Sequence, residues 1–309
     1  MKKLTFGFFL KTFIGDIKYV ERLIKSYDRF NVDEIKMVLM CPNSDLEEFK
    51  KLVTKNIFLY EEETLAKYLV DEEEYNEINT TSSRGYFNQS ILKLCFWELG
   101  FFENYFCVDS EVVFIKDFYF DDFMFDDSLP YTFLVEDNEL KVDPYYFDTY
   151  WKSREVLLEK IKKTIGLIDQ RILTIHGMTN FSSHVLKSLK NDFMIKKGFE
   201  YKDLLKTSGY EFSWYNFWLQ KNKTIPIKFR EPIIKTFHFR EQHTDYLKKN
   251  ITINDIARGY LGYLINSNYS RDSGVVDYEN SNYIVPFSEI IKSFMELIKI
   301  LFRRLIYFK

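Results

Sequence analysis

Short apolar runs alternate with amphipathic segments at the start of this chain, and this alternation constrains the fold more than any other feature. Residues 4–10, 35–41 and 57–60 are apolar runs bounded by polar residues, a pattern typical of buried strands. Residues 16–27 repeat apolar side chains at helical spacing, and the polar break at 42–44 can cap a second helix. The order strand–helix–strand–helix–strand predicts parallel pairing with right-handed crossovers.

The rest of the chain continues this alternation. The predicted helices span residues 87–99, ended by Gly100, then 151–165, a segment capped by Asn180, and 210–219. The predicted strands span residues 105–108, 112–115, 131–135, 172–175 and 233–239. The acidic and then Asn-, Thr- and Ser-rich segment 71–83 predicts a mobile surface loop. The predicted fold class is α/β, with a Rossmann-type mixed, mainly parallel sheet flanked by helices.

The C-terminal region differs in composition from the rest. Residues 266–285 are polar and predict a linker that follows a domain of residues 1–265. Residues 286–309 predict a basic amphipathic helix, which charges interrupt too often for a membrane span. Such a helix suits the interface of an anionic membrane, such as the inner face of the cytoplasmic membrane. It equally suits packing on its own domain or on a second copy in a homodimer.

Charge and cysteine content argue against several classes of protein. The net charge of −3 is unfavourable for a nucleic-acid-binding domain, so we expect no nucleic-acid partner. The three cysteines form no C-x-x-C pair, which disfavours a cysteine zinc site. Their odd number, with Cys95 and Cys107 in apolar segments, favours reduced thiols in the cytoplasm. Lys11 and Asp16 interrupt the apolar N-terminal run, and no small-residue cleavage site follows. This run therefore predicts a buried strand rather than a signal peptide.

The sequence Asp109-Ser110-Glu111 directly follows the predicted strand 105–108. In open α/β sheets, ligands bind outside the carboxyl ends of the strands, where Asp109 is expected. Glu111 lies two residues further on, so in an extended segment both carboxylates point the same way. Two such oxygen ligands suit Mn²⁺ or Mg²⁺, although the short motif taken alone is more often a simple turn.

The helix before this strand presents polar side chains to the same edge. Gln89 and Lys93 are four residues apart and share one helical face, and Arg84 lies at the helix entrance. Basic side chains of this kind bind phosphate oxygens. For Lys93 alone, an ordinary solvated helix charge is the alternative interpretation.

Together, these residues resemble bacterial glycosyltransferases of the GT-A type from capsule and lipopolysaccharide clusters. The shared pattern is aromatic-x-x-Gln-x-x-x-Lys-Leu, a short gap, an apolar strand, Asp-Ser-Asp/Glu and Val-Val-Phe. The resemblance implies a GT-A-like fold, a nucleotide-sugar donor and a Mn²⁺ or Mg²⁺ ion. It places Asp109 against the donor and Glu111 on the metal, where the family usually has a second Asp.

The resemblance extends to the opening strand and the loop after it. Thr12 and Asp16 occupy the loop that in such folds lies against the nucleotide base. The likeness covers the first half of the chain well and the second half only in outline. It implies a nucleotide-sugar-binding half at residues 1–120 and an acceptor-binding half at residues 121–265.

The second half holds three further candidates. Glu211 lies in Ser208-Gly209-Tyr210-Glu211, which resembles the Ser-x-Tyr-Glu stretch of related enzymes. Its aromatic neighbours should desolvate it and raise its pKa, which suits a general base in an inverting displacement, and a structural acid is the alternative. Asp137, in the turn after a predicted strand, is the rival base. His238, near the end of the last predicted strand, matches the late histidine with which many GT-A enzymes complete metal coordination.

These observations favour a metal-dependent glycosyltransferase that adds a sugar to a capsular polysaccharide or lipopolysaccharide. Its acceptor would be a glycan or a lipid-linked molecule at the inner membrane. The alternative is a non-catalytic nucleotide-sugar-binding or scaffolding protein of a polysaccharide assembly complex. The donor base, the sugar and the stereochemistry stay open, because GT-A enzymes of both stereochemistries share the metal motif.

Overall fold

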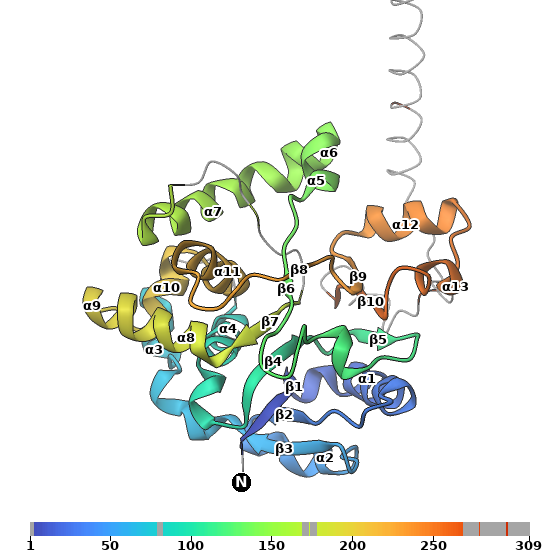
Figure 1. Cartoon of the computed structure of the whole chain (residues 1–309), viewed down its shortest axis with the longest axis horizontal. Helices are drawn as coiled ribbons and strands as arrows, with labels where there is room; N and C mark the ends of the chain where they lie inside the picture. The colour runs from blue at the N-terminus through green and yellow to red at the C-terminus, as the bar shows by residue number, and fades with distance from the viewer. Residues whose placement is uncertain are drawn as a thin grey trace, which may run out of the picture.

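A five-stranded sheet forms the centre of the described part of the chain (Figure 1). The structure is a computed structural model that describes residues 3–78, 83–168, 173, 178–267, 278 and 295. Its strands lie in the order β3-β2-β1-β4-β7. They are β1 (Leu4–Lys11), β2 (Met37–Cys41), β3 (Ile57–Glu61), β4 (Phe102–Val108) and β7 (Asn180–Ser182). Only the β4–β7 pair is antiparallel. The fold class is therefore the predicted one, a mixed, mainly parallel sheet flanked by helices.

Two smaller sheets complete the strands of the described residues. The first has the order β5-β10-β9, in which β10 pairs antiparallel with β5 and parallel with β9. These strands are β5 (Val112–Phe114), β9 (Ile234–Phe237) and β10 (Gly262–Ile265). The second joins β6 (Thr132–Phe133) to β8 (Phe229–Arg230). Because β5 begins one residue after Glu111, this arrangement brings the carboxyl ends of β9 and β10 to the end of β4.

Side chains of the central sheet alternate between two hydrophobic clusters, one on each face, as the strand pleat requires. Phe9 of β1 packs with helices α4, α7, α8, α10 and α11, whereas its neighbours Phe8 and Leu10 pack with α1, α2 and β5. The helices are α1 (Ile17–Phe30), α2 (Leu46–Lys50), α4 (Arg84–Cys95), α7 (Lys152–Ile165), α8 (Ser183–Ser188), α10 (Tyr201–Thr207) and α11 (Glu211–Asn222). Burial on both faces explains why β1 and β2 are almost continuously apolar.

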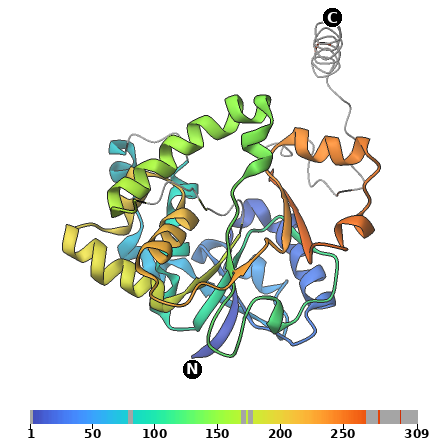
Figure 2. The same ribbon diagram turned by 45° about the horizontal axis from the view of Figure 1, so that its top comes forward.

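The remaining helices lie around this core. They are α3 (Glu72–Glu77), α5 (Asn138–Val142), α6 (Pro144–Tyr146), α9 (Ile195–Lys197), α12 (Arg240–Lys248) and α13 (Ile253–Ile256). Both views place the α5–α7 segment and α12 on the side of the molecule away from the N-terminus (Figures 1 and 2). None of the helices among the described residues is long and apolar enough to cross a membrane. Cys41, Cys95 and Cys107 are buried free thiols.

Most of the predicted elements form close to their expected positions, with three exceptions. The side chains of residues 42–44 do not cap α2, whose N-cap is Asp45. Part of the predicted loop 71–83 is α3, in which the Asp71 side chain accepts a hydrogen bond from the Glu74 N–H at 2.8 Å. Asn180 does not cap a helix but begins β7, and its side-chain amide donates to the carbonyl of Phe123 at 2.8 Å. The backbone of Asn180 pairs with Phe106 of β4, and this contact in the sheet outweighs the local preference of Asn for a helix N-cap.

Some predictions fall on residues beyond the described ranges. The predicted strand 172–175 has only residue 173 described, and the predicted C-terminal helix 286–309 only Met295. The linker 266–285 is described at residues 266, 267 and 278 alone. The division of the chain into domains therefore stays a prediction.

Candidate active site

A pocket of about 630 Å³ opens at the carboxyl edge of the central sheet. The ends of β1 and β4 form its floor, because Leu10 pairs with Val108 and so sets Lys11 and Thr12 beside Asp109 and Ser110. The hydroxyl of Ser110 donates to that of Thr12 at 3.2 Å. The first turns of α4 and α11, together with residues of α7 and of the β9 and β10 ends, complete the wall. This is where open α/β sheets bind ligands.

Lys93 lies at the centre of the pocket's charged groups. Its ammonium is 2.9 Å from Oδ1 of Asp109 and 3.2 Å from Oε1 of Glu211, and it lies over the Phe212 ring at 4.7 Å. Only 5% of its side chain is exposed. Burial alone would lower the pKa of Lys93, but the charges of the two carboxylates raise it well above its ordinary value. Lys93 is therefore a permanent cation that joins α4, β4 and α11.

Tyr86 and Glu211 line the pocket because each lies in the first turn of a helix, Tyr86 in α4 and Glu211 in α11. The Ser83 hydroxyl accepts from the Tyr86 N–H at 3.3 Å and caps α4, and a Cβ added at Gly85 would meet open space. Glu211 is the first residue of α11 and is 4% exposed. The charge of Glu211 raises the pKa of Tyr86, which is itself 46% exposed. The Tyr86 phenol therefore stays protonated beside Glu211 and can serve as a hydrogen-bond donor.

Acidic side chains converge on the strand end below Lys93. Glu111 lies beside the end of β10, where its Oε1 accepts from the Ser267 N–H at 3.4 Å. Burial raises the pKa of Glu111, and the charges of Asp109 and then Asp16 raise it further. Mutual repulsion of this kind is relieved when a cation binds.

The pocket offers a divalent cation two carboxylate ligands and leaves its remaining coordination positions to a substrate and water. Within the described ranges, no three His, Cys, Asp or Glu side chains form a group that could hold a metal ion. Asp109 and Glu111 supply two carboxylates, and Mg²⁺ commonly takes one or two from the protein and its other ligands from phosphates and water. His238 lines the same pocket without forming such a group with these acids.

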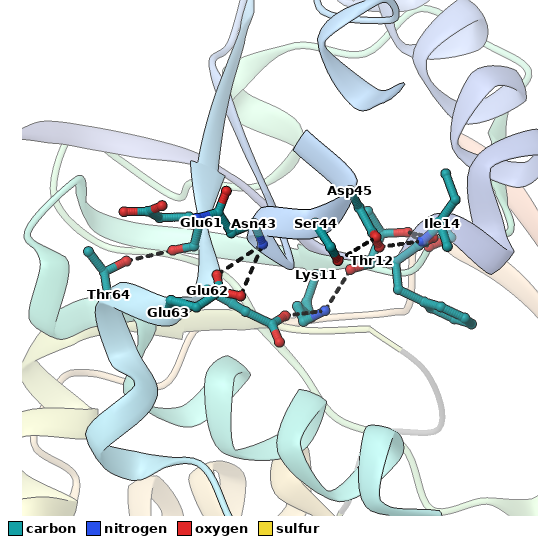
Figure 3. A network of polar contacts seen from close by, with 12 residues as sticks. Lys11, Thr12, Ile14, Asn43, Ser44, Asp45, Glu61, Glu62, Glu63 and Thr64 are labelled. Atoms are coloured by element: carbon teal, nitrogen blue, oxygen red, sulfur yellow. Dashed lines mark hydrogen bonds and ion pairs between the residues drawn. The ribbon is translucent and has the colours of Figure 1, made fainter. Parts of the chain in front are cut away.

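A second charged pair lies at the end of β1 (Figure 3). The Lys11 ammonium is 2.7 Å from Oε2 of Glu62 and donates to the carbonyl of Thr12 at 2.6 Å. Lys11 and Glu62 both line the pocket, and their side chains are 9% and 18% exposed. Glu62 comes from the segment η3 (Glu62–Tyr68) that directly follows β3.

The structure gathers nearly all of the predicted site residues in this one pocket. Its lining includes Thr12, Asp16, Arg84, Gln89, Lys93, Asp109, Glu111, Glu211 and His238. Arg84 is at the rim, where its Nε is 2.7 Å from Oε2 of Glu72 and 46% of its side chain is exposed. Their individual roles stay predictions.

Asp137 is the one predicted site residue that is not part of the pocket lining. It precedes α5 in a left-handed conformation with φ 54° and is 7% exposed. Burial raises its pKa to about 6, against the opposing charge of Arg154, whose Nε is 4.0 Å away. Its perturbed pKa therefore follows from burial in the fold rather than from the charged groups around Lys93.

Several pocket residues were not found by sequence reasoning. They are Lys11, Phe13, Glu62, Tyr86, Arg154, Tyr210, Phe212, Asn266 and Ser267. Lys11 could have been predicted from the sequence, because a charged residue at the end of a buried strand needs a partner of opposite charge or a polar site. Phe13, Tyr86, Tyr210 and Phe212 lie within two residues of predicted site residues in the sequence. The rest reach the pocket through tertiary folding, as Ser267 does through the pairing of β10 with β5.

Comparison with known proteins gives a family. A model described as a family of unknown function, DUF6492, matches residues 9–256. The chain belongs to this family. No curated protein matches its sequence significantly.

Two solved structures resemble the chain at low sequence identity. The apo form of mouse xyloside xylosyltransferase 1 has 10% identity and a TM-score of 0.46, over 86% of this chain and 99% of that one. The apo bifunctional glycosyltransferase WbbM has 11% identity and a TM-score of 0.45, over 85% of this chain and 45% of that one. Both are glycosyltransferases, but at these TM-scores the likeness does not assign a function to this chain.

Proposed function

We propose that this protein transfers a sugar from a nucleotide-sugar donor to a surface glycan, a capsular polysaccharide or a lipopolysaccharide. The observation that supports it most is the buried Lys93, which holds Asp109 and Glu211 in a pocket at the carboxyl edge of the sheet. Such a constellation is costly to bury and adds little to stability, so a functional role is the better explanation.

The donor would bind along the acids at the strand end. Asp109 and Glu111 would hold a Mn²⁺ or Mg²⁺ ion, with His238 as a further ligand, and such an ion would supply positive charge against the departing nucleoside diphosphate. Arg84 at the rim and the α4 N-terminus, with Gln89 on the following turn, supply donors for phosphate oxygens. Thr12 and Asp16 line the pocket on the β1 side, where the nucleoside would lie.

Glu211 is the proposed general base. In an inverting transfer, an acceptor hydroxyl oxygen forms a bond to the anomeric carbon as the bond from that carbon to the diphosphate oxygen breaks. The hydroxyl proton passes to the Glu211 carboxylate, and the bonding electrons leave with the nucleoside diphosphate. Lys93 would keep this carboxylate in place, since its ammonium lies 3.2 Å away.

The acceptor and the cellular setting follow from the sequence resemblance. A glycan or lipid-linked acceptor would approach at the inner face of the cytoplasmic membrane. The basic segment 286–309 would hold the protein there or join two copies.

A screen of nucleotide sugars tests the proposal. We expect one donor to raise the melting temperature of the protein, and to be hydrolysed slowly, in a manner stimulated by Mn²⁺ or Mg²⁺. Asp109→Asn preserves the shape of the side chain and should abolish the metal-dependent part of both responses. A donor that binds and is never hydrolysed or transferred would favour the scaffolding alternative, and no binding by any donor would refute both.

Paired amide variants test the base. Glu211→Gln should lower kcat by about 10²–10⁴ with little change in donor affinity, as expected for loss of a general base. Asp137→Asn, which changes the rival base, is the comparison variant, because Asp137 is also buried, at 7% exposed against 4% for Glu211, but is not part of the pocket lining. If Asp137→Asn lost the activity and Glu211→Gln kept it, the assignment of the base would be reversed.

A further inference from the structure

Residues 144–151 carry five aromatic side chains, none of which takes part in the proposed chemistry. Trp151 is 1% exposed and belongs to the core, so it anchors the segment. Tyr145 and Phe147, in contrast, are 39% and 36% exposed. A π-helical turn, η6 (Phe147–Trp151), joins α6 to α7, and such turns are frequent at functional sites. The segment therefore presents aromatic surface to solvent, which is typical of a binding surface.

Two of these rings stack on Phe239, the residue that precedes α12. The Tyr150 and Phe239 ring centroids are 3.4 Å apart at an interplanar angle of 13°, and those of Tyr146 and Phe239 are 6.3 Å apart at 27°. The Tyr145 ring completes the group, with its centroid 5.7 Å from that of Tyr146. In both views α6 and the start of α12 accordingly lie side by side (Figures 1 and 2). Tyr145, Tyr146, Tyr150 and Phe239 thus form one aromatic cluster.

A carboxylate lies at the edge of the aromatic cluster. The Tyr145 hydroxyl donates to Oε1 of Glu241 at 2.8 Å, and the Tyr150 hydroxyl donates to Oε2 at 3.4 Å. A carboxylate can accept about four hydrogen bonds, so these two leave capacity for further donors. A sugar ring presents a face of C–H bonds, which packs on aromatic rings, and hydroxyl groups, which donate to carboxylates. The aromatic cluster and Glu241 offer a partner for each.

The charges around the aromatic cluster disfavour a phosphate-bearing partner. Burial raises the pKa of the Tyr146 phenol, and four carboxylates raise it further, those of Asp245, Glu241, Glu139 and Asp143. Two of these acids have lysine partners, because Lys235 is 3.8 Å from Glu139 and Lys248 is 3.7 Å from Asp245. Asp143 and Glu241 instead accept from N–H and hydroxyl groups of the tyrosines. Their negative charge repels the phosphates of an anionic membrane and suits a neutral or amino-sugar glycan.

The aromatic cluster adjoins the pocket without lining it. Phe239 directly follows His238, and Tyr150 precedes Arg154 by four residues. His238 and Arg154 both line the pocket. An elongated ligand that lies on the aromatic cluster can therefore continue into the pocket.

We propose that the aromatic cluster and Glu241 form a binding surface, outside the pocket, for a neutral or amino-sugar glycan chain. This inference rests on the proposed function, because it identifies the acceptor as a chain of several sugar units rather than a single lipid-linked sugar. The reacting end of the chain lies in the pocket, and the units before it lie on the aromatic cluster. Tyr145 and Glu241 are therefore binding residues and take no part in the chemical step.

An array of bacterial capsular and lipopolysaccharide glycans tests this surface, followed by isothermal titration with fragments of the glycan that binds best. Affinity should rise from a disaccharide to a hexasaccharide, as the chain extends from the pocket onto the aromatic cluster. Tyr145→Ala should weaken binding of the hexasaccharide about 5- to 30-fold, the effect of losing one aromatic contact, and leave disaccharide and nucleoside diphosphate affinities unchanged. Tyr145 is 39% exposed, so this variant should fold normally, which its thermal unfolding checks.

Three further variants separate the ring, the carboxylate and unspecific surface effects. Tyr145→Phe keeps the ring and should retain most of the hexasaccharide affinity. Glu241→Gln keeps the shape of the side chain but removes its charge, so it should weaken hexasaccharide binding severalfold. Tyr119→Ala removes a similarly exposed ring (45%) that is not in the pocket lining, and this matched control should bind as the wild type does.

Several results would overturn the glycan surface. They are the binding of no glycan on the array, equal hexasaccharide affinity in wild type and Tyr145→Ala, and an equal loss for the disaccharide. Binding to phosphatidylglycerol vesicles that Tyr145→Ala abolishes would show a membrane contact in its place. Absence of nucleotide-sugar binding and hydrolysis in a wild-type protein that still binds the hexasaccharide would instead overturn the proposed function, so the two failures are distinguishable.

Discussion

Two buried lysines line the same pocket, and their partners differ. Lys93 lies between two carboxylates from distant parts of the chain, Asp109 and Glu211, with 5% of its side chain exposed. Lys11 has one carboxylate partner, Glu62, which is itself 18% exposed, and a carbonyl of the adjacent residue. Lys93 therefore neutralises a cluster that would otherwise carry two facing negative charges, whereas Lys11 pairs with a single carboxylate. This difference in partners predicts how much stability the protein loses when each lysine is replaced.

The largest effect is expected from Lys93→Met. Removing the ammonium leaves Asp109 and Glu211 facing each other without a counter-charge, which should cost about 3–5 kcal/mol of the free energy of unfolding and abolish transfer. Urea denaturation measures the first and a transfer assay the second. Adding Glu211→Gln to this variant removes one of the two negative charges and should restore much of the stability. An unchanged unfolding curve for Lys93→Met would contradict the role of the cluster.

Asp137 tests whether a buried carboxylate that is not part of the pocket lining changes the free energy of unfolding about as much as Lys93→Met does. Its pKa is raised from 3.8 to about 6, so between these values the folded state binds more protons than the unfolded state. Stability should therefore fall as pH rises through this window, by about 3 kcal/mol in total, and Asp137→Asn should remove the fall. Urea unfolding at pH 3.5 and pH 7 measures the difference. Parallel pH profiles for wild type and variant would show that Asp137 is not the titrating group.

Lys11→Met should have a smaller effect than Lys93→Met. It leaves one carboxylate, Glu62, without its partner, where Lys93→Met leaves two that face each other, so we expect a loss of about 1–2 kcal/mol. Addition of Glu62→Gln should recover most of it. If Lys11→Met destabilised the protein as strongly as Lys93→Met, the contrast between the two lysines would be lost.

Arg84→Ala should have the smallest effect on stability. The Arg84–Glu72 pair is largely exposed, at 46% and 71%, and surface pairs of this kind contribute about 0.5 kcal/mol or less. The variant should nevertheless weaken nucleoside diphosphate binding severalfold if Arg84 contacts phosphate. Thermal unfolding and titration on the same sample separate the two effects, and Glu72→Ala, which breaks the same ion pair, is the control.

Much of the fold was predictable from the sequence, because its elements carry strong local signals. The apolar runs of β1 and β2 are buried on both faces, and Gly100, with φ 73°, ends the predicted helix that precedes β4. The helical face shared by Gln89 and Lys93 also follows from local geometry and was predicted. Asn180 was wrongly assigned because its backbone pairs with Phe106 of a strand far away in sequence.

The sequence by itself determined the alternating strands and helices at the start and their parallel pairing, the acids at the end of β4 and most of the candidates that line the pocket. It did so because periodicity, turn residues and strand ends are local properties. Only the tertiary structure decided which charges meet. Lys93 and Glu211 lie 118 residues apart, and their contact depends on how α4 and α11 pack on one face of the sheet. Likewise, the loop after β1 is held by a hydrogen bond from the Ile14 N–H to Oδ2 of Asp45, which lies 31 residues further along the chain.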